Sequence, residues 1–266
     1  MNNYLLIVSV CVLYLAATAM LLHSLRANPD TERYKNRRSL WVAGIALVLH
    51  AYTAWQQAGL PDALSLPFFT ALSVMGVAIV AIQLIMCIWR PADYLGLAIY
   101  PIAAFGLLAG ALNTNDAAPL PAAVQAHVML SITAYAVLAL AAVQAVLVLV
   151  QRNQLNNHKP GGFVRRLPPL TATESLLFWF ITVGFVLLTL SLISGMIFLE
   201  DMFAQHLAHK TVLSCLAWVI FAVLLFGRWR FGWRGQRVVR WTVAGFITLL
   251  LAYFGSKLVL ELILQR

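Results

Sequence analysis

The sequence predicts an all-α integral membrane protein, a bundle of eight transmembrane helices with both termini outside. Of its 266 residues 62% are hydrophobic and only 10% are charged, whereas soluble domains carry roughly 25% charged residues. The apolar residues form runs of about 20 residues, the length with which a helix crosses a bilayer while satisfying its own backbone hydrogen bonds. The basic residues, in contrast, gather in alternate loops between these runs.

The apolar runs place the helices in order along the chain. We expect helices at approximately residues 4–25, 39–57, 67–89, 93–112, 122–150, 173–199, 206–227 and 238–264. The fifth helix is longer than a bilayer requires, so it should tilt or project beyond the membrane surface.

The basic residues give the expected orientation. Four loops contain them: Arg26, Arg33, Lys35, Arg37 and Arg38; Arg90; Arg152, Lys159, Arg165 and Arg166; Arg228, Arg230, Arg234 and Arg237. The other three loops, 58–66, 113–121 and 200–205, contain no Lys or Arg. Because basic loops stay in the cytoplasm, both termini are expected to face outward, and the chain is expected in a bacterial inner membrane.

Charge and motifs exclude several function classes. The net charge of +9 follows from the cytoplasmic loops, so we expect no nucleic-acid partner. The cysteines form no CxxC pair, which argues against a thiol-redox or covalent haem site; they are Cys11, Cys87 and Cys215. No nucleotide, hydrolase or metalloprotease motif occurs, so the chain is not expected to be an enzyme.

His127 and His209 are the leading candidates for a cofactor site. Each lies near the outer start of an expected span, within about 10 Å of the outer surface at 1.5 Å per residue. Imidazoles at one depth on two helices suit the axial positions of a haem iron, which predicts noncovalent haem b. The alternative is a pair of interfacial histidines, each with one ring edge in water.

Two more histidines are candidates. His206 lies one turn before His209, where it could contact the same cofactor or, with Glu200 and Asp201, a divalent metal. His50 is expected near the middle of the bilayer, where ionisable groups are costly and often functional. It is either a second station for haem or an interhelical hydrogen-bonding group.

Other polar and small residues within the spans are assigned to helix packing. Gln83 and Gln144 are expected to form interhelical hydrogen bonds rather than a polar pathway, and Gly106 and Gly110 form a GxxxG pattern that permits close helix contact.

The later part of the chain carries a series of short motifs in a recognisable order. They are His127–Tyr135, Leu167–Glu174, Gly184–Gly195, Lys210–Trp218, Gly232–Gly235 and Gly245–Gly255. In this order and spacing they resemble the cytochrome c assembly proteins, the haem-handling group that includes CcsA, CcmC and HemX-like proteins. The run from Phe198 to Lys210 is most similar to the YpjD-like branch.

The resemblance implies a role for one histidine. A histidine at the position of His127 is an axial haem ligand on the outer face in this family. The family also has a tryptophan-rich outer loop and a second histidine near the end of the last span. Here residues 198–208 contain no tryptophan and residues 257–266 no histidine. His209 is therefore our inferred second ligand.

These observations predict a haem-handling inner-membrane protein, with haem and possible membrane or cytochrome-assembly proteins as partners. We expect a two-span segment at residues 1–64 and a cytochrome c assembly-like domain at residues 65–266. One alternative is a HemX-like regulatory or scaffold protein without stable haem. The other is a small-molecule exporter, which would require more polar groups in mid-bilayer than His50, Gln83 and Gln144.

Overall fold

The computed structural model describes residues 2–26, 33–60, 64–111, 120–157, 162–198 and 205–255, and these form helices joined by short connections. The α-helices are α1 (Asn2–Arg26), α2 (Arg33–Gln57), α3 (Phe68–Trp89), α4 (Gly96–Ala111), α5 (Ala122–Asn156), α6 (Leu170–Phe198), α7 (Gln205–Phe231) and α8 (Gln236–Leu250). Shorter elements are the 3-10 helices η2 (Asp93–Leu95) and η3 (Gly162–Arg166) and the π-helical turn η4 (Leu251–Gly255).

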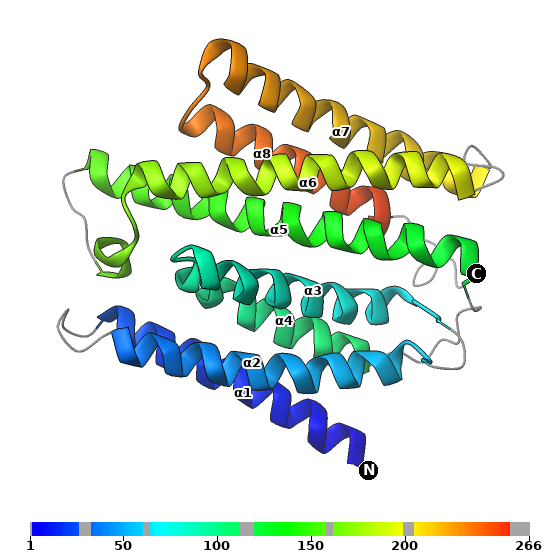
Figure 1. Cartoon of the computed structure of the whole chain (residues 1–266), viewed down its shortest axis with the longest axis horizontal. Helices are drawn as coiled ribbons and strands as arrows, with labels where there is room; N and C mark the ends of the chain where they lie inside the picture. The colour runs from blue at the N-terminus through cyan, green and yellow to red at the C-terminus, as the bar shows by residue number, and fades with distance from the viewer. Residues whose placement is uncertain are drawn as a thin grey trace. The chain divides into compact units, whose positions relative to one another are not determined.

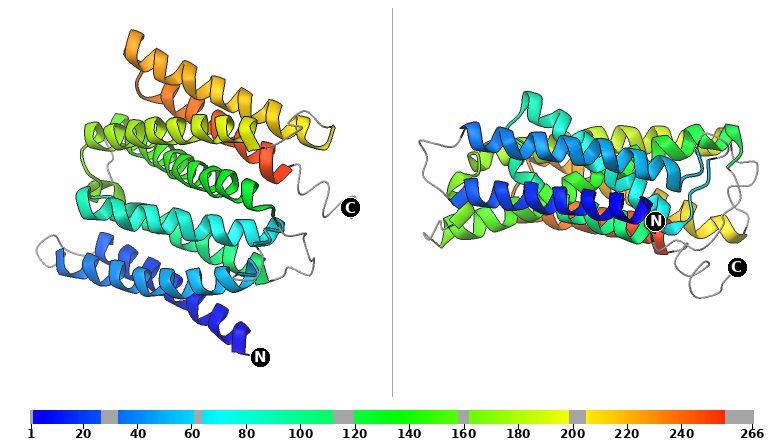
Figure 2. Two further views of the ribbon diagram at one scale, coloured as in Figure 1. Left: turned by 45° about the vertical axis from the view of Figure 1, so that its right-hand side comes forward. Right: turned by 90° about the horizontal axis from the view of Figure 1, so that it is seen from below.

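The helices form two compact units, shown in Figures 1 and 2. Unit 1 comprises residues 1–120 and 157–168, and in it α1 packs against α2, α4 and η3 while α3 packs against α4. Unit 2 comprises residues 121–156 and 169–266, in which α5 packs along α6 and against α8, and α7 packs against α6 and α8. The chain therefore enters unit 2 for α5, returns to unit 1 for η3, and enters unit 2 again.

Prolines set several helix boundaries. Arg90, which follows α3, is extended at φ −135° and ψ 146°, as expected for a residue that precedes proline. α5 begins directly after Pro121, and α6 begins directly after Pro168 and Pro169. The first amide groups of a helix have no acceptor within the helix. A proline, which has no amide hydrogen, therefore costs no hydrogen bond at these positions.

Glycines shape the turn between α7 and α8. Gly232 and Gly235 have φ values of 65° and 64°, which residues with a side chain rarely adopt. The Arg228 guanidinium donates to the Trp233 carbonyl across this turn at 3.3 Å. The Gly232–Gly235 motif is thus a backbone requirement of the tight α7–α8 connection.

Small residues bring α3 and α4 together in unit 1, as the GxxxG pattern predicts. A Cβ added to Gly106 would lie 3.0 Å from the Leu72 carbonyl oxygen of α3. A Cβ on Gly110 would lie 3.0 Å from Cβ of Ser73. The predicted close contact of this helix is confirmed.

The all-helical prediction is confirmed, and six described helices are long and apolar enough to cross a membrane. These are Tyr4–Arg26, Phe68–Trp89, Asp93–Ala111, Val124–Asn156, Leu170–Phe198 and Lys210–Phe231. α2 is outside this set because it begins with a basic segment and ends on two glutamines, and α8 has only 15 residues. Residues 256–266, which include the predicted end of the eighth span, lie outside the described part. Eight spans and outward termini stay predictions, as does the domain boundary at residue 64.

The fifth helix is longer than expected. It has 35 residues, about 52 Å at 1.5 Å per residue, against a hydrocarbon core of about 30 Å. The predicted end at residue 150 therefore falls six residues short, because the polar residues after it continue the helix beyond the apolar run.

Candidate functional site

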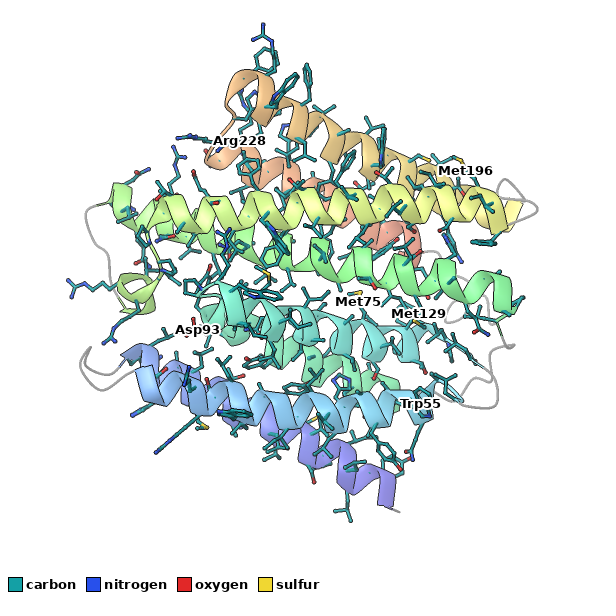
Figure 3. The ribbon with its side chains drawn as sticks, in the orientation of Figure 1. Trp55, Met75, Asp93, Met129, Met196 and Arg228 are labelled. Atoms are coloured by element: carbon teal, nitrogen blue, oxygen red, sulfur yellow. The ribbon has the colours of Figure 1, made fainter. Side chains whose placement is uncertain are left out.

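His127 lies in the second turn of α5 and faces α6 within unit 2. Its Nδ1 atom is 2.9 Å from Oγ of Ser194, and its side chain is half-buried. Met129 and Met196, labelled in Figure 3, mark the same end of α5 and α6. Arg228 lies at the opposite end of unit 2 in that view, so the histidine is far from the arginine-rich turn.

The hydrogen bonds around Ser194 favour a proton on Nδ1 of His127. The Ser194 hydroxyl donates to the carbonyl oxygen of Ser191 at 2.8 Å. A serine has a single hydroxyl hydrogen, so Ser194 accepts from Nδ1–H of His127. A neutral imidazole that donates from Nδ1 has its lone pair on Nε2. Among the described residues, the hydrogen-bond partners of the imidazole are the Ser194 hydroxyl and the Ser191 carbonyl.

A row of serines supports this geometry. The Ser131 hydroxyl donates to the His127 carbonyl at 2.7 Å, so it accepts from the Ser191 hydroxyl, also at 2.7 Å. Two hydroxyls of α6 and one of α5 thus join the two helices beside the histidine. A metal-binding histidine commonly donates its second ring N–H to such a partner, which orients the ring.

The two other candidates predicted near the outer face lie only partly in the described structure. His206 and His209 belong to the first turns of α7, but their side chains, together with Glu200 and Asp201, lie outside the described residues. Within the described part, no group of three or more metal-ligating side chains occurs. The pairing of His127 with His209, and the contact of His206, stay predictions.

His50 lies in the interior of unit 1 and is fully buried. Its Nδ1 is 3.2 Å from the Tyr14 hydroxyl of α1, and its Nε2 is 3.2 Å from the Ser73 hydroxyl of α3. Gly76 provides space for the ring, since a Cβ there would lie 3.2 Å from Cε1 of His50. Both ring nitrogens are engaged with neighbouring helices, which favours the interhelical role over a second haem station.

The buried glutamines also bridge helices or loops, as predicted. The Gln83 amide donates to the Ala92 carbonyl at 3.2 Å and accepts from the Tyr100 hydroxyl at 3.3 Å. In unit 2, the Gln144 amide of α5 donates to the Thr173 carbonyl of α6 at 2.9 Å. These groups are satisfied within their own units, so they favour packing over the polar pathway that an exporter needs.

Replacing His50 with leucine tests its role. We expect the free energy of unfolding to fall by roughly 1–3 kcal/mol, because the buried Tyr14 and Ser73 hydroxyls lose their partner. Thermal unfolding in detergent measures this, with His23→Leu as the control, since His23 is exposed. Haem content should not change; loss of haem at unchanged stability would instead identify a haem station.

The comparison with known families identifies the chain. The family described as "Cytochrome C assembly protein" matches residues 38–264, which is most of the chain. The chain belongs to the cytochrome c assembly protein family. The match begins within α2, and it includes the whole of α5 and α6, where His127 and its serine partners lie.

Individual members of the family show how far the similarity reaches. The inner membrane protein YpjD of Escherichia coli K12 is 36% identical over 236 residues, which cover 85% of this chain and 88% of that protein. The cytochrome c biogenesis protein CcsA of Prochlorococcus marinus MIT 9303 is 34% identical over 87 residues, or 32% of this chain and 27% of that protein. No solved structure gives a significant match. With six membrane-length helices, this family member is a multi-pass inner-membrane protein.

The sequence analysis missed the hydroxyl partners of the histidines. Ser131 follows His127 by four residues, and Ser191 precedes Ser194 by three, so each pair lies on one helix face. Such pairs of polar residues on two helices that face each other could have indicated the hydrogen bonds between α5 and α6. In contrast, nothing in the local sequence indicates that Tyr14 and Ser73 meet His50, because the partners are 36 and 23 residues away.

Proposed function

We propose that this protein handles haem in cytochrome c assembly, binding it noncovalently as haem b with Nε2 of His127 as an axial ligand. The observation that carries the proposal is the hydrogen bond from His127 Nδ1 to Ser194. It leaves the lone pair of Nε2 available, and a neutral imidazole nitrogen is a common haem ligand. Family membership supports the same role.

The surroundings of His127 fit a large apolar cofactor. The ring is only half-buried, and Met129, two residues further along α5, is 40% exposed. Met196 and Ile197, on α6 beside Ser194, are 65% and 69% exposed. A porphyrin has apolar faces that such side chains could cover. His209 is proposed as the second ligand, because it lies on α7, another helix of the same unit, and at the same predicted depth.

The test is the absorbance spectrum of the full-length protein purified in mild detergent, with haem quantified per chain. We expect haem that acid–acetone extracts, since the cysteines form no covalent attachment motif, and a low-spin Soret band. Protein that contains no haem, even after growth with added haem precursor, would overturn the proposal. Such protein co-purifying with another membrane protein would support the HemX-like scaffold alternative.

Replacing Ser194 with alanine should weaken haem binding without removing the ligand. The expected decrease in affinity is roughly 10- to 100-fold, the usual cost of losing a hydrogen-bond partner of a metal-binding histidine. Thr182→Ala is the matched control, because this exposed α6 hydroxyl donates only to its own helix, at Phe178. Haem titration of both variants measures the difference; equal affinities would show that Ser194 does not orient the ring.

A further inference from the structure

The arginine-rich end of unit 2 has a large excess of positive charge. Six arginines gather there, from the end of α5, the end of α7, the turn after it and the start of α8: Arg152, Arg228, Arg230, Arg234, Arg237 and Arg240. Among the described residues of unit 2, Glu174 is the single carboxylate. No ion pair joins any of these arginines to a described carboxylate, so within the described part of unit 2 their charge is not neutralised.

Tryptophans hold part of this cluster in place. The guanidinium of Arg237 lies over the Trp233 ring, 5.1 Å from its centroid. The Trp233 ring in turn lies 5.9 Å from that of Trp241, centroid to centroid. Arg152 of α5 packs on Gly235, which has no side chain to displace it. Tryptophan and arginine in this arrangement are typical of the headgroup region of a bilayer.

An apolar groove between α7 and α8 opens beside these residues. It has a volume of about 240 Å³ and is lined by Ile220 of α7 and by Arg240, Trp241 and Ala244 of α8. Its surface is almost wholly apolar apart from Arg240. Ala244 lies one helical turn further along α8 than Arg240, so the groove runs from the charged end toward the apolar part of the helices.

We propose that this groove binds an anionic phospholipid. The phosphate would lie at Arg240 and Arg237, and an acyl chain would lie along Ile220 and Ala244. The charge excess selects a negative headgroup, because basic residues near an anionic bilayer surface each contribute to lipid attraction. The apolar lining selects a lipid over a soluble phosphate, since only the lipid carries a chain to fill it.

The experiment is native mass spectrometry of the full-length protein in detergent with phosphatidylglycerol or phosphatidylcholine of identical acyl chains. The wild-type protein should retain phosphatidylglycerol preferentially. In Arg237→Gln/Arg240→Gln, we expect about 30-fold weaker retention of phosphatidylglycerol, as the loss of two basic contacts of about 1 kcal/mol each implies. The control is Arg26→Gln/Arg90→Gln, which removes two exposed arginines of unit 1 and should retain the lipid as the wild type does.

A third variant separates the groove from general surface charge. Ala244→Trp fills the groove but keeps every arginine, and Ala244 is exposed, so the change does not disturb the core. We expect it to retain phosphatidylglycerol as weakly as the double arginine variant does. Retention equal to wild type in Ala244→Trp, equal loss in both arginine double variants, or equal retention of the two lipids would each overturn the proposal. Unchanged thermal unfolding without lipid verifies that each variant folds.

Discussion

Replacing His127 with glycine is expected to remove the low-spin Soret band, and millimolar imidazole is expected to restore it. The glycine leaves a space where the ring stood, between α5 and Ser194 of α6, and free imidazole can occupy that space and offer the same nitrogen. Loss of a partner that only orients a ligand costs about 10- to 100-fold in affinity, so loss of the ligand itself should cost at least as much. Absorbance spectra with and without imidazole measure both effects.

Ala126→Gly is the control for this experiment. It introduces the same helix-destabilising residue one position earlier, at an exposed site, and costs about 1 kcal/mol of helix stability while keeping the imidazole. Its spectrum should match that of the wild type. A His127→Gly or His127→Ala protein that retains the full low-spin band would exclude His127 as a ligand.

The second large effect is expected from Gly184→Ala in the centre of the α5–α6 contact. A Cβ at Gly184 would lie 2.5 Å from Cδ2 and 2.6 Å from Cγ of Leu138. Leu138 is fully buried, so its side chain has to shift within the core to admit the methyl group. Overpacking of this kind typically costs about 1–3 kcal/mol, which should appear as a lower midpoint of thermal unfolding in detergent.

Gly44→Ala is the matched control, because it adds the same methyl group to another helix. A Cβ at Gly44 of α2 has no neighbouring atom within 4 Å. Alanine there should be neutral or stabilising by up to about 1 kcal/mol, since it restricts the unfolded chain and favours the helix. Equal destabilisation by both substitutions would show that the Leu138 contact does not limit α5–α6 packing.

The sequence was sufficient to predict the helices and part of their packing. Long apolar runs require helices in a bilayer, and proline and glycine mark where these runs end. The sequence therefore predicted α3, α6 and the α7–α8 turn. The GxxxG pair at Gly106 and Gly110 indicated a close contact for the same reason. The end of α5 was not predicted, because the polar residues after residue 150 can either continue the helix or form a loop.

The site was harder to predict, because its geometry depends on contacts between distant residues. Depth along a helix follows from the rise per residue, so the sequence predicts that His127 lies near one end of its span, as it does in α5. The protonation of its ring depends on Ser194, which is 67 residues away. No periodic pattern in the sequence indicates that contact. From the sequence, His50 could equally be a ligand or a packing group, since the free-energy cost of burying an imidazole in mid-bilayer is the same for either role. Its hydrogen bonds with Tyr14 and Ser73 in the structure distinguish the two roles.

The path of the chain through the two units has a consequence for synthesis. η3 belongs to unit 1 and packs against α1, yet it emerges from the ribosome only after all of α5. The N-terminal four helices are therefore synthesised before the segment that completes their packing exists. A nascent chain arrested before residue 157 should be more sensitive to protease in α1–α4 than one long enough for residues 157–168 to have left the ribosome.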